Sequence, residues 1–167
     1  MNDSEIKKIL EDSKTIAMTD LTTSAIERVL RNNYLGHLAY LWQGKPHVIP
    51  FTYYFDPTDN TIISYTSEGH KIDAMRKNNS VTVQVEEIQS MFNWESAMVH
   101  GTFEELEGSV AKQKLHLFTE GVKSIIRRKE RREVEFINEF SSKIYSRGIP
   151  IVYRIKIQEV IGKRRET

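Results

Sequence analysis

The stretch TIISYTSEGHKIDAMRKNN, residues 61–79, changes from a strand pattern to a helix pattern within a few residues. Its first part, residues 61–66, is rich in β-branched and aromatic side chains, which are typical of strands. The later part places Ile72 and Met75 at helical spacing, and paired asparagines end the pattern. The stretch therefore predicts a strand, a tight turn at SEGHK and one crossover helix.

The turn SEGHK has the composition of an anion-binding site. If Ser67 caps the helix, backbone N–H groups point outward at the positive end of the helix dipole. Gly69 would let an anion approach the backbone, and Lys71 and a protonated His70 would add charged donors. Thr66 could add a hydroxyl. An ordinary capped helix with two solvated basic side chains is the alternative, and the turn by itself favours it.

The residues on either side of this stretch predict further antiparallel strands. Residues 36–43 and 47–55 precede it, separated by turn-forming residues, so that three consecutive strands are expected. Residues 80–88, 96–106 and 151–162 follow it, with Val81, Val83 and Val85 on one face and a bulge at Gly101. About six strands indicate a closed or partly closed barrel, because closure hides the sheet edges.

Helical patterns flank these strands. Residues 22–33 predict a short helix with a capping box formed by Ser24 and Glu27. Residues 108–126 and 133–145 carry apolar side chains at helical intervals and predict two helices laid over the barrel.

The bulk composition favours one domain over residues 1–167, with a polar lead-in at 1–20 and a helical insertion at 108–147. The net charge of +1 gives no general reason to expect nucleic acid or a membrane as a partner. The absence of cysteine excludes thiol chemistry and thiolate metal sites. A charged amino terminus and the lack of a long apolar run lead us to expect a cytoplasmic protein.

Other chemistries find little support in the residue spacing. The histidines show no i, i+4 pair, so no metal site is expected, and no G-x-S-x-G turn presents a serine for hydrolysis. Residues 125–133, IIRRKERRE, could contact phosphates, but interleaved glutamates favour a solvated helix face. Trp94, just before a strand, is interpreted as a core or interface anchor, or else as a wall against a planar ligand.

Taken together, these motifs resemble the FMN-binding split-barrel superfamily that includes pyridoxamine 5'-phosphate oxidase, and most closely its nitroimidazole-resistance (Nim) branch. The resemblance rests on the order of P-F-T-Y, Y-T-S-x-G-H-K, W-x-S and V-x-G along the chain. It implies a mainly β, six-stranded antiparallel FMN-binding split barrel of Greek-key type with flanking helices. It also implies a homodimer with FMN between the subunits.

The resemblance assigns cofactor contacts to matching positions, without naming a catalytic residue. The phosphate and ribityl chain would lie at the turn, and the flavin ring along the main chain of the strand at residues 50–52. Ser96 would occupy a further cofactor-contacting strand position. The expected cofactor-binding residues are Pro50, Phe51, Thr52, Tyr65, Thr66, Ser67, His70, Lys71, Trp94 and Ser96.

By resemblance, we expect an oxidoreductase that passes hydride or electrons through flavin to a small planar or nitro-aromatic acceptor. The chain ends GKRRET and lacks the oxidase's carboxyl-terminal arginine and tryptophan pattern, so pyridoxamine phosphate is not the expected substrate. The main alternative is a protein that binds flavin or haem for storage, sensing or degradation without turnover. A deazaflavin in place of FMN, and a nucleic-acid-contacting module, also remain open.

Overall fold

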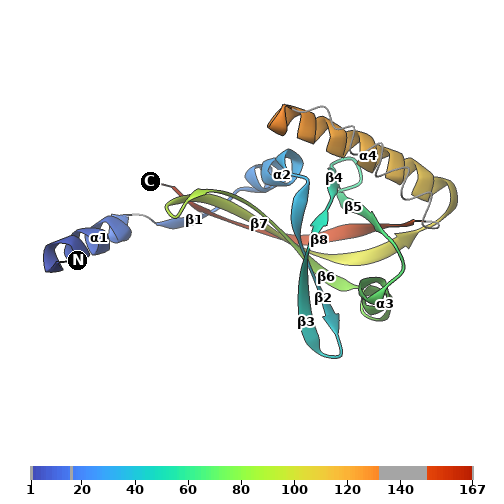
Figure 1. The fold of residues 1–167 in the computed structure, drawn as a ribbon, viewed down its shortest axis with the longest axis horizontal. Coiled ribbons are helices and arrows are strands. Elements are labelled where there is room, and N and C mark those ends of the chain that lie inside the picture. Colours follow the sequence, from blue (N-terminus) through green and yellow to red (C-terminus); the bar gives the residue numbers. More distant parts are fainter. Residues whose placement is uncertain (1, 16, 132–149, 167) are drawn as a thin grey trace.

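The computed structural model describes residues 2–15, 17–131 and 150–166 (Figure 1). Strands dominate, with helices placed around them. The helices are α1 (Asp3–Thr15), α2 (Thr23–Asn32), α3 (His70–Lys77) and α4 (Gly108–Glu130). The strands are β1 (Met18–Asp20), β2 (Leu35–Trp42), β3 (Lys45–Thr52), β4 (Tyr54–Asp56), β5 (Thr61–Thr66), β6 (Ser80–Ser90), β7 (Asn93–Leu106) and β8 (Ile151–Arg165).

The strands form one antiparallel sheet with the order β3-β2-β6-β7-β8-β5-β4, and β1 pairs with β8. The mainly β class and the split-barrel architecture are confirmed, with eight strands instead of the expected six. Residues 47–55 divide at Tyr53 into β3 and β4, although the Tyr53 N–H still donates to the Tyr34 carbonyl at 2.8 Å, in register with the β2–β3 pairing. The other added strand is β1, which lies with α1 inside the expected polar lead-in.

The barrel is split between β3 and β5. The expectation of three consecutive antiparallel strands holds, because β2 pairs with β3, and residues 54–55 of the predicted second strand, which lie in β4, pair with β5. On its other side β5 pairs with β8. A side chain spans part of the gap: the Ser64 hydroxyl on β5 donates to the Thr52 carbonyl on β3 at 2.8 Å. One end of β3 is therefore held beside β5 without a ladder of backbone hydrogen bonds.

The helix caps differ from the sequence prediction. The amino-terminal cap of α2 is Thr22, whose hydroxyl accepts from the Ala25 N–H at 3.2 Å, so the predicted capping box at Ser24 and Glu27 is wrong. The helix begins two residues earlier than that box requires, but its predicted apolar face, including Ile26 and Val29, is buried as expected. The expected helix at 133–145 lies outside the described residues.

The core lies on the concave side of the sheet. Val81, Val83 and Val85 of β6 are buried there, as their alternation predicts. The pairing of β7 with β8 shifts register between His100 and Gly101, which confirms the predicted bulge. Gly101 is required by close packing, because a Cβ at that position would lie 2.5 Å from the Lys156 carbonyl oxygen.

Replacement of Gly101 by Ala should therefore destabilise the apoprotein by about 1–3 kcal/mol, since backbone in β8 must move to admit the methyl group. Gly69→Ala is the matched control, because a Cβ there meets no atom within 4 Å. Urea unfolding followed by circular dichroism measures both variants. Equal stabilities of Gly101→Ala and Gly69→Ala would contradict the packing argument.

Candidate functional site

The turn between β5 and α3 leaves the start of the helix open. The helix begins at His70 with Gly69 as its amino-terminal cap, and no side chain makes a capping hydrogen bond. The predicted cap at Ser67 is therefore wrong, because the helix starts two residues later than a Ser67 cap requires. A Cβ on Gly69 would meet nothing within 4 Å, so the backbone of the turn is accessible. Uncapped N–H groups at an open helix start favour an anion.

Lys71 adds a positive charge at this helix start, and no described residue pairs with it. Its side chain is half-buried, and burial lowers the pKa of its ammonium group. Desolvation is the only cause of that shift, with no contribution from a neighbouring carboxylate. A cation that loses water without gaining a partner among the described residues is a good receptor for an anionic ligand.

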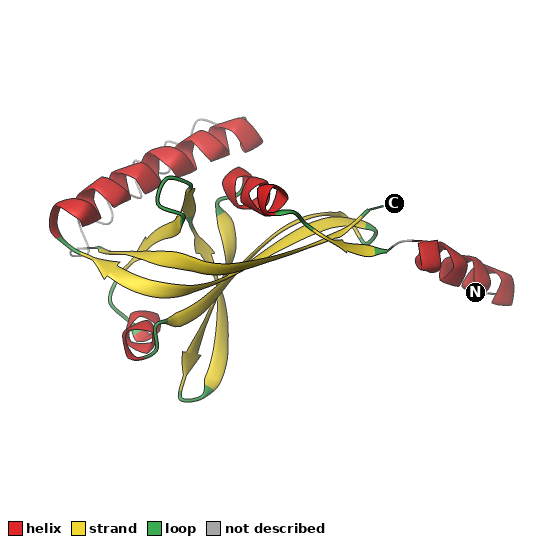
Figure 2. Cartoon of the chain, turned by 180° about the vertical axis from the view of Figure 1, so that it is seen from behind, coloured by secondary structure: helices red, strands yellow, loops and turns green. Residues whose placement is uncertain are grey.

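His70 packs on the hairpin formed by β2 and β3, which projects beside α3 (Figure 2). Its ring lies edge-on to Trp42, with centroids 4.7 Å apart, and 5.5 Å from the ring of His47. The Tyr40 hydroxyl lies 3.4 Å from His70 Nδ1, and Lys77 covers the Trp42 ring at 4.6 Å. This aromatic cluster fixes the first residue of α3 against the sheet.

Sequence reasoning assigned no role to the aromatic cluster. A signal was present, because Tyr40 and Trp42 are two residues apart and therefore lie on one face of a strand. Their pairing with a helix 30 residues later is a tertiary contact that the strand pattern does not encode.

The structure brings part of the predicted site together around the β3–β5 gap. The Ser64–Thr52 hydrogen bond places the end of β3 next to β5, whose last residues are Tyr65 and Thr66. Phe51 points into the core and stacks on Tyr53, with ring centroids 5.8 Å apart, so only its main chain is available to a ligand. Pro50, the preceding residue, is exposed on the opposite face.

Tyr65 differs from the other residues near the turn. Its ring packs edge-on against Phe118 of α4, with centroids 5.2 Å apart, and burial raises the pKa of its phenol. The Tyr65 side chain therefore takes part in the contact between β5 and α4.

Trp94 and Ser96 lie far from the turn within one chain. On β8, Thr66 at the turn pairs with Ile151, whereas Ser96 pairs with Lys163. Twelve residues of extended strand separate these two positions, which corresponds to about 40 Å. Figure 1 likewise places the carboxyl-terminal end of β8 and the start of α3 on opposite sides of the molecule. One chain alone does not assemble all the predicted cofactor contacts.

The face of the sheet opposite the core, here called the outer face, carries both polar and exposed apolar side chains. Ser96 accepts a hydrogen bond from Gln84 at 3.1 Å, and Gln84 pairs across the ladder with His37, which in turn pairs with Pro50. The exposed apolar side chains on this face are Leu35, Val48, Ile88 and Ile161. Their exposed fractions range from 36% to 68%, which is high for large apolar residues and typical of a surface that binds a partner.

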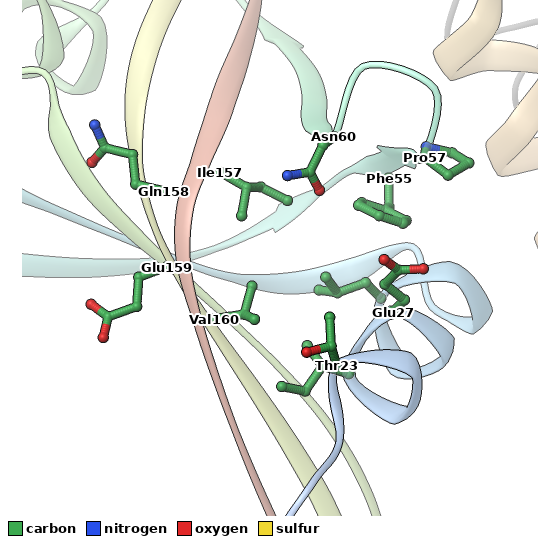
Figure 3. Close-up of a pocket in the computed structure, with 11 residues that line it drawn as sticks. Thr23, Glu27, Phe55, Pro57, Asn60, Ile157, Gln158, Glu159 and Val160 are labelled. Carbon is green, nitrogen blue, oxygen red and sulfur yellow. The ribbon is translucent and has the colours of Figure 1, made fainter.

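A separate pocket of about 290 Å³ lies between α2, the β4–β5 loop and β8 (Figure 3). Thr23 and Glu27 come from α2, and Phe55 from β4, while Val160 lies on β8. The lining includes Glu27 and Glu159 but no lysine, arginine or histidine, and it contains none of the predicted site residues. Figure 3 shows the Glu159 side chain directed away from Thr23 and Phe55, so Glu27 supplies the carboxylate of the pocket. Such a lining disfavours a phosphate group.

The described residues give little support to a metal site, a nucleic-acid site or a membrane span. No group of three or more potential metal ligands occurs among the residues that were placed. The described part of the basic run fastens α4 to α2, because Lys129 donates to Asn33 and Arg128 lies 3.5 Å from the Asn32 side chain. No helix in the described ranges is long and apolar enough to cross a membrane.

Comparisons with known proteins agree with the fold. A family model described as pyridoxamine 5'-phosphate oxidase matches residues 22–164. A curated relative, an uncharacterized protein from Rhizobium meliloti (strain 1021), is 35% identical over 72 residues, or 43% of this chain. The match spans 46% of that relative, about half of its length.

Two solved structures are similar in fold. A FAD-binding protein from Mesorhizobium loti is 25% identical, with a TM-score of 0.67, covering 91% of this chain and 99% of that one. A putative 5-nitroimidazole antibiotic resistance protein from Bacteroides thetaiotaomicron is 17% identical, with a TM-score of 0.65, covering 90% and 89%.

Lys71→Met should raise the thermal midpoint of the apoprotein slightly at pH 7, because it removes a half-buried charge that has no partner among the described residues. The pKa of Lys71 is lower in the folded than in the unfolded chain, so the wild type is penalised fully below the folded pKa. The difference between the proteins should shrink as pH rises through the folded pKa towards the unfolded value. Melting curves at several pH values measure this, and a clear loss of stability in Lys71→Met would contradict it.

Proposed function

Because the chain belongs to the pyridoxamine 5'-phosphate oxidase family, we propose that it is a flavoprotein that holds FMN at the turn between β5 and α3. The observation that carries the proposal is the half-buried Lys71 ammonium beside an uncapped helix start. A flavin fits this family context, since the similar protein from Mesorhizobium loti is described as FAD-binding. The residues present fit the phosphate of such a cofactor in charge and access.

In this proposal the phosphate is bound by Lys71, by the free N–H groups of the first turn of α3, and by hydroxyls at Thr66 and Ser67. His70 adds a donor when its ring is protonated. Tyr65 contributes through its main chain and orients β5 against α4, since its ring contacts Phe118.

The flavin ring would lie along β3, which is an edge strand of the described sheet. An edge strand carries main-chain polar groups that have no ladder partner on one side. Phe51 and Thr52 can therefore contact a planar heterocycle through the backbone, while Pro50 presents an apolar surface. The Thr52 carbonyl is already held by Ser64, which fixes the position of this strand end.

A homodimer completes the site in our proposal. Trp94 and Ser96 lie about 40 Å along β8 from the turn of their own chain, so their predicted cofactor contacts require a second subunit. The exposed apolar side chains of the outer face, which also carries Ser96, supply a surface that such a partner would cover.

Bound flavin supplies hydride or electron transfer, and the protein has to bind it, orient it and exclude water. An oxidoreductase with a reduced nicotinamide donor and a small planar or nitro-aromatic acceptor is the activity we propose. The neighbour from Bacteroides thetaiotaomicron is too distant in sequence to support the acceptor, which stays a prediction together with the cytoplasmic location. Flavin or haem binding without turnover is the competing function.

The first test compares the affinities of purified Lys71→Ala and wild-type protein for FMN by fluorescence titration. Loss of a charge-assisted contact should weaken FMN binding about tenfold to a hundredfold. Riboflavin, which lacks the phosphate, should bind both proteins alike. Lys112→Ala removes an exposed lysine from α4 and serves as the matched control. Unchanged FMN affinity in Lys71→Ala would refute the phosphate assignment.

The second test adds NADH or NADPH to the flavin-loaded protein under anaerobic conditions. Rapid bleaching of the flavin absorbance is expected for an oxidoreductase with a nicotinamide donor. Flavin that stays oxidised over hours with both nucleotides would favour the binding function instead.

A further inference from the structure

Arg76 joins the proposed phosphate turn to the sheet through bidentate hydrogen bonds to two carboxylates. Its Nη1 and Nη2 donate to the two carboxylate oxygens of Glu68, both at 2.9 Å. Its Nε and Nη2 donate to the two carboxylate oxygens of Glu105 at 2.8 and 2.9 Å. Glu68 lies in the turn, Arg76 on α3 and Glu105 on β7. We call these three residues the Arg76 clamp.

Glu68 is out of place on a turn that receives an anion. It lies directly between Ser67 and Gly69, three residues before Lys71, and a carboxylate there repels a phosphate and competes for the same N–H groups. The clamp removes both effects, because both Glu68 oxygens accept hydrogen bonds from Arg76 and the positive charge offsets the negative one.

A purely structural explanation accounts poorly for the clamp. The side chains are partly exposed, with fractions of 37% for Arg76, 66% for Glu68 and 31% for Glu105. Exposed ion pairs contribute little to the free energy of unfolding. Hydrogen bonds to Glu105 and Glu68 raise the pKa of the Arg76 guanidinium, so the clamp stays charged over the range of a binding experiment.

We infer, building on the proposed flavin site, that Arg76 is a positioning residue that makes the turn selective for a phosphorylated flavin. It holds the Glu68 carboxylate away from the helix start and compensates its charge, so that this carboxylate does not oppose the phosphate group at the donors of the turn. Arg76 also lies 3.7 Å from the carboxylate of Asp73 in the first turn of α3. Glu105 orients the guanidinium from β7 and fixes its direction. The ligand class is a flavin with a terminal phosphate, and the clamp discriminates it from riboflavin.

The experiment measures dissociation constants of full-length Arg76→Gln, Glu68→Gln and the double variant for FMN and for riboflavin. Arg76→Gln should weaken FMN binding about three- to tenfold, because an uncompensated carboxylate then faces the phosphate. Riboflavin binding should stay within about twofold of wild type, because it carries no charge to repel. The double variant should recover the FMN affinity, and Glu68→Gln alone should bind FMN at least as tightly as wild type.

Salt and a matched control separate this role from a general structural one. The loss in Arg76→Gln should shrink as ionic strength rises, since salt screens repulsion between exposed charges. Arg31→Gln removes an exposed ion pair with Glu27 within α2, 3.5 Å apart, and should leave both affinities unchanged.

Three outcomes overturn the inference. The first is an equal loss of FMN and riboflavin in Arg76→Gln, and the second is a failure of Glu68→Gln to restore FMN binding in the double variant. The third is wild-type FMN affinity in Arg76→Gln. If the wild type binds neither flavin, the proposed function itself fails. That result differs from one in which the wild type binds FMN and the clamp variants bind it equally well, which refutes only the inference about Arg76.

Discussion

Strand β8 is the constraint on which the arrangement of the site depends. Its first half pairs with β5, from Thr61 to Thr66, and most of its length pairs with β7. Because an extended chain rises by a fixed amount per residue, this one strand sets the distance between the turn and the far end of β7. The sheet holds the two groups of predicted site residues apart, which is why our proposal brings them together through a second subunit.

Desolvation without a partner is the second determinant of the site. Lys71 is half-buried beside an uncapped helix start, so the folded apoprotein carries an unfavourable charge that a bound anion would compensate. Ligand binding and stability are thereby linked, since a ligand that binds only the folded chain stabilises it by mass action. The same local feature weakens the fold and favours phosphate, which is a common compromise at functional sites.

Local patterns predicted the elements around the site well. The change of hydrophobic period at residues 61–79 gave β5 and α3, and the alternation of Val81, Val83 and Val85 gave the buried face of β6. The bulge at Gly101 could be predicted because glycine inside a strand often marks a close backbone approach.

The failures of sequence reasoning concern competition between neighbours and contacts over long distances. Thr22 and Ser24 are both good caps, and the sequence does not decide between them. The pairing of residues 54–56 with β5, while residues 45–52 pair with β2, is a tertiary arrangement that no local pattern encodes. The Arg76 clamp depends on Glu105, which is 29 residues away. The aromatic cluster around His70 likewise depends on contacts with the β2–β3 hairpin.

Charge, more than volume, distinguishes the turn from the pocket beside α2. The pocket encloses about 290 Å³, yet its lining includes the carboxylate of Glu27 and no lysine, arginine or histidine. An anionic cofactor would meet repulsion there, whereas the turn offers an ammonium, free N–H groups and a glutamate already held by an arginine. We therefore place the proposed phosphate site at the accessible turn and not in the pocket, because binding an anion requires compensation of its charge.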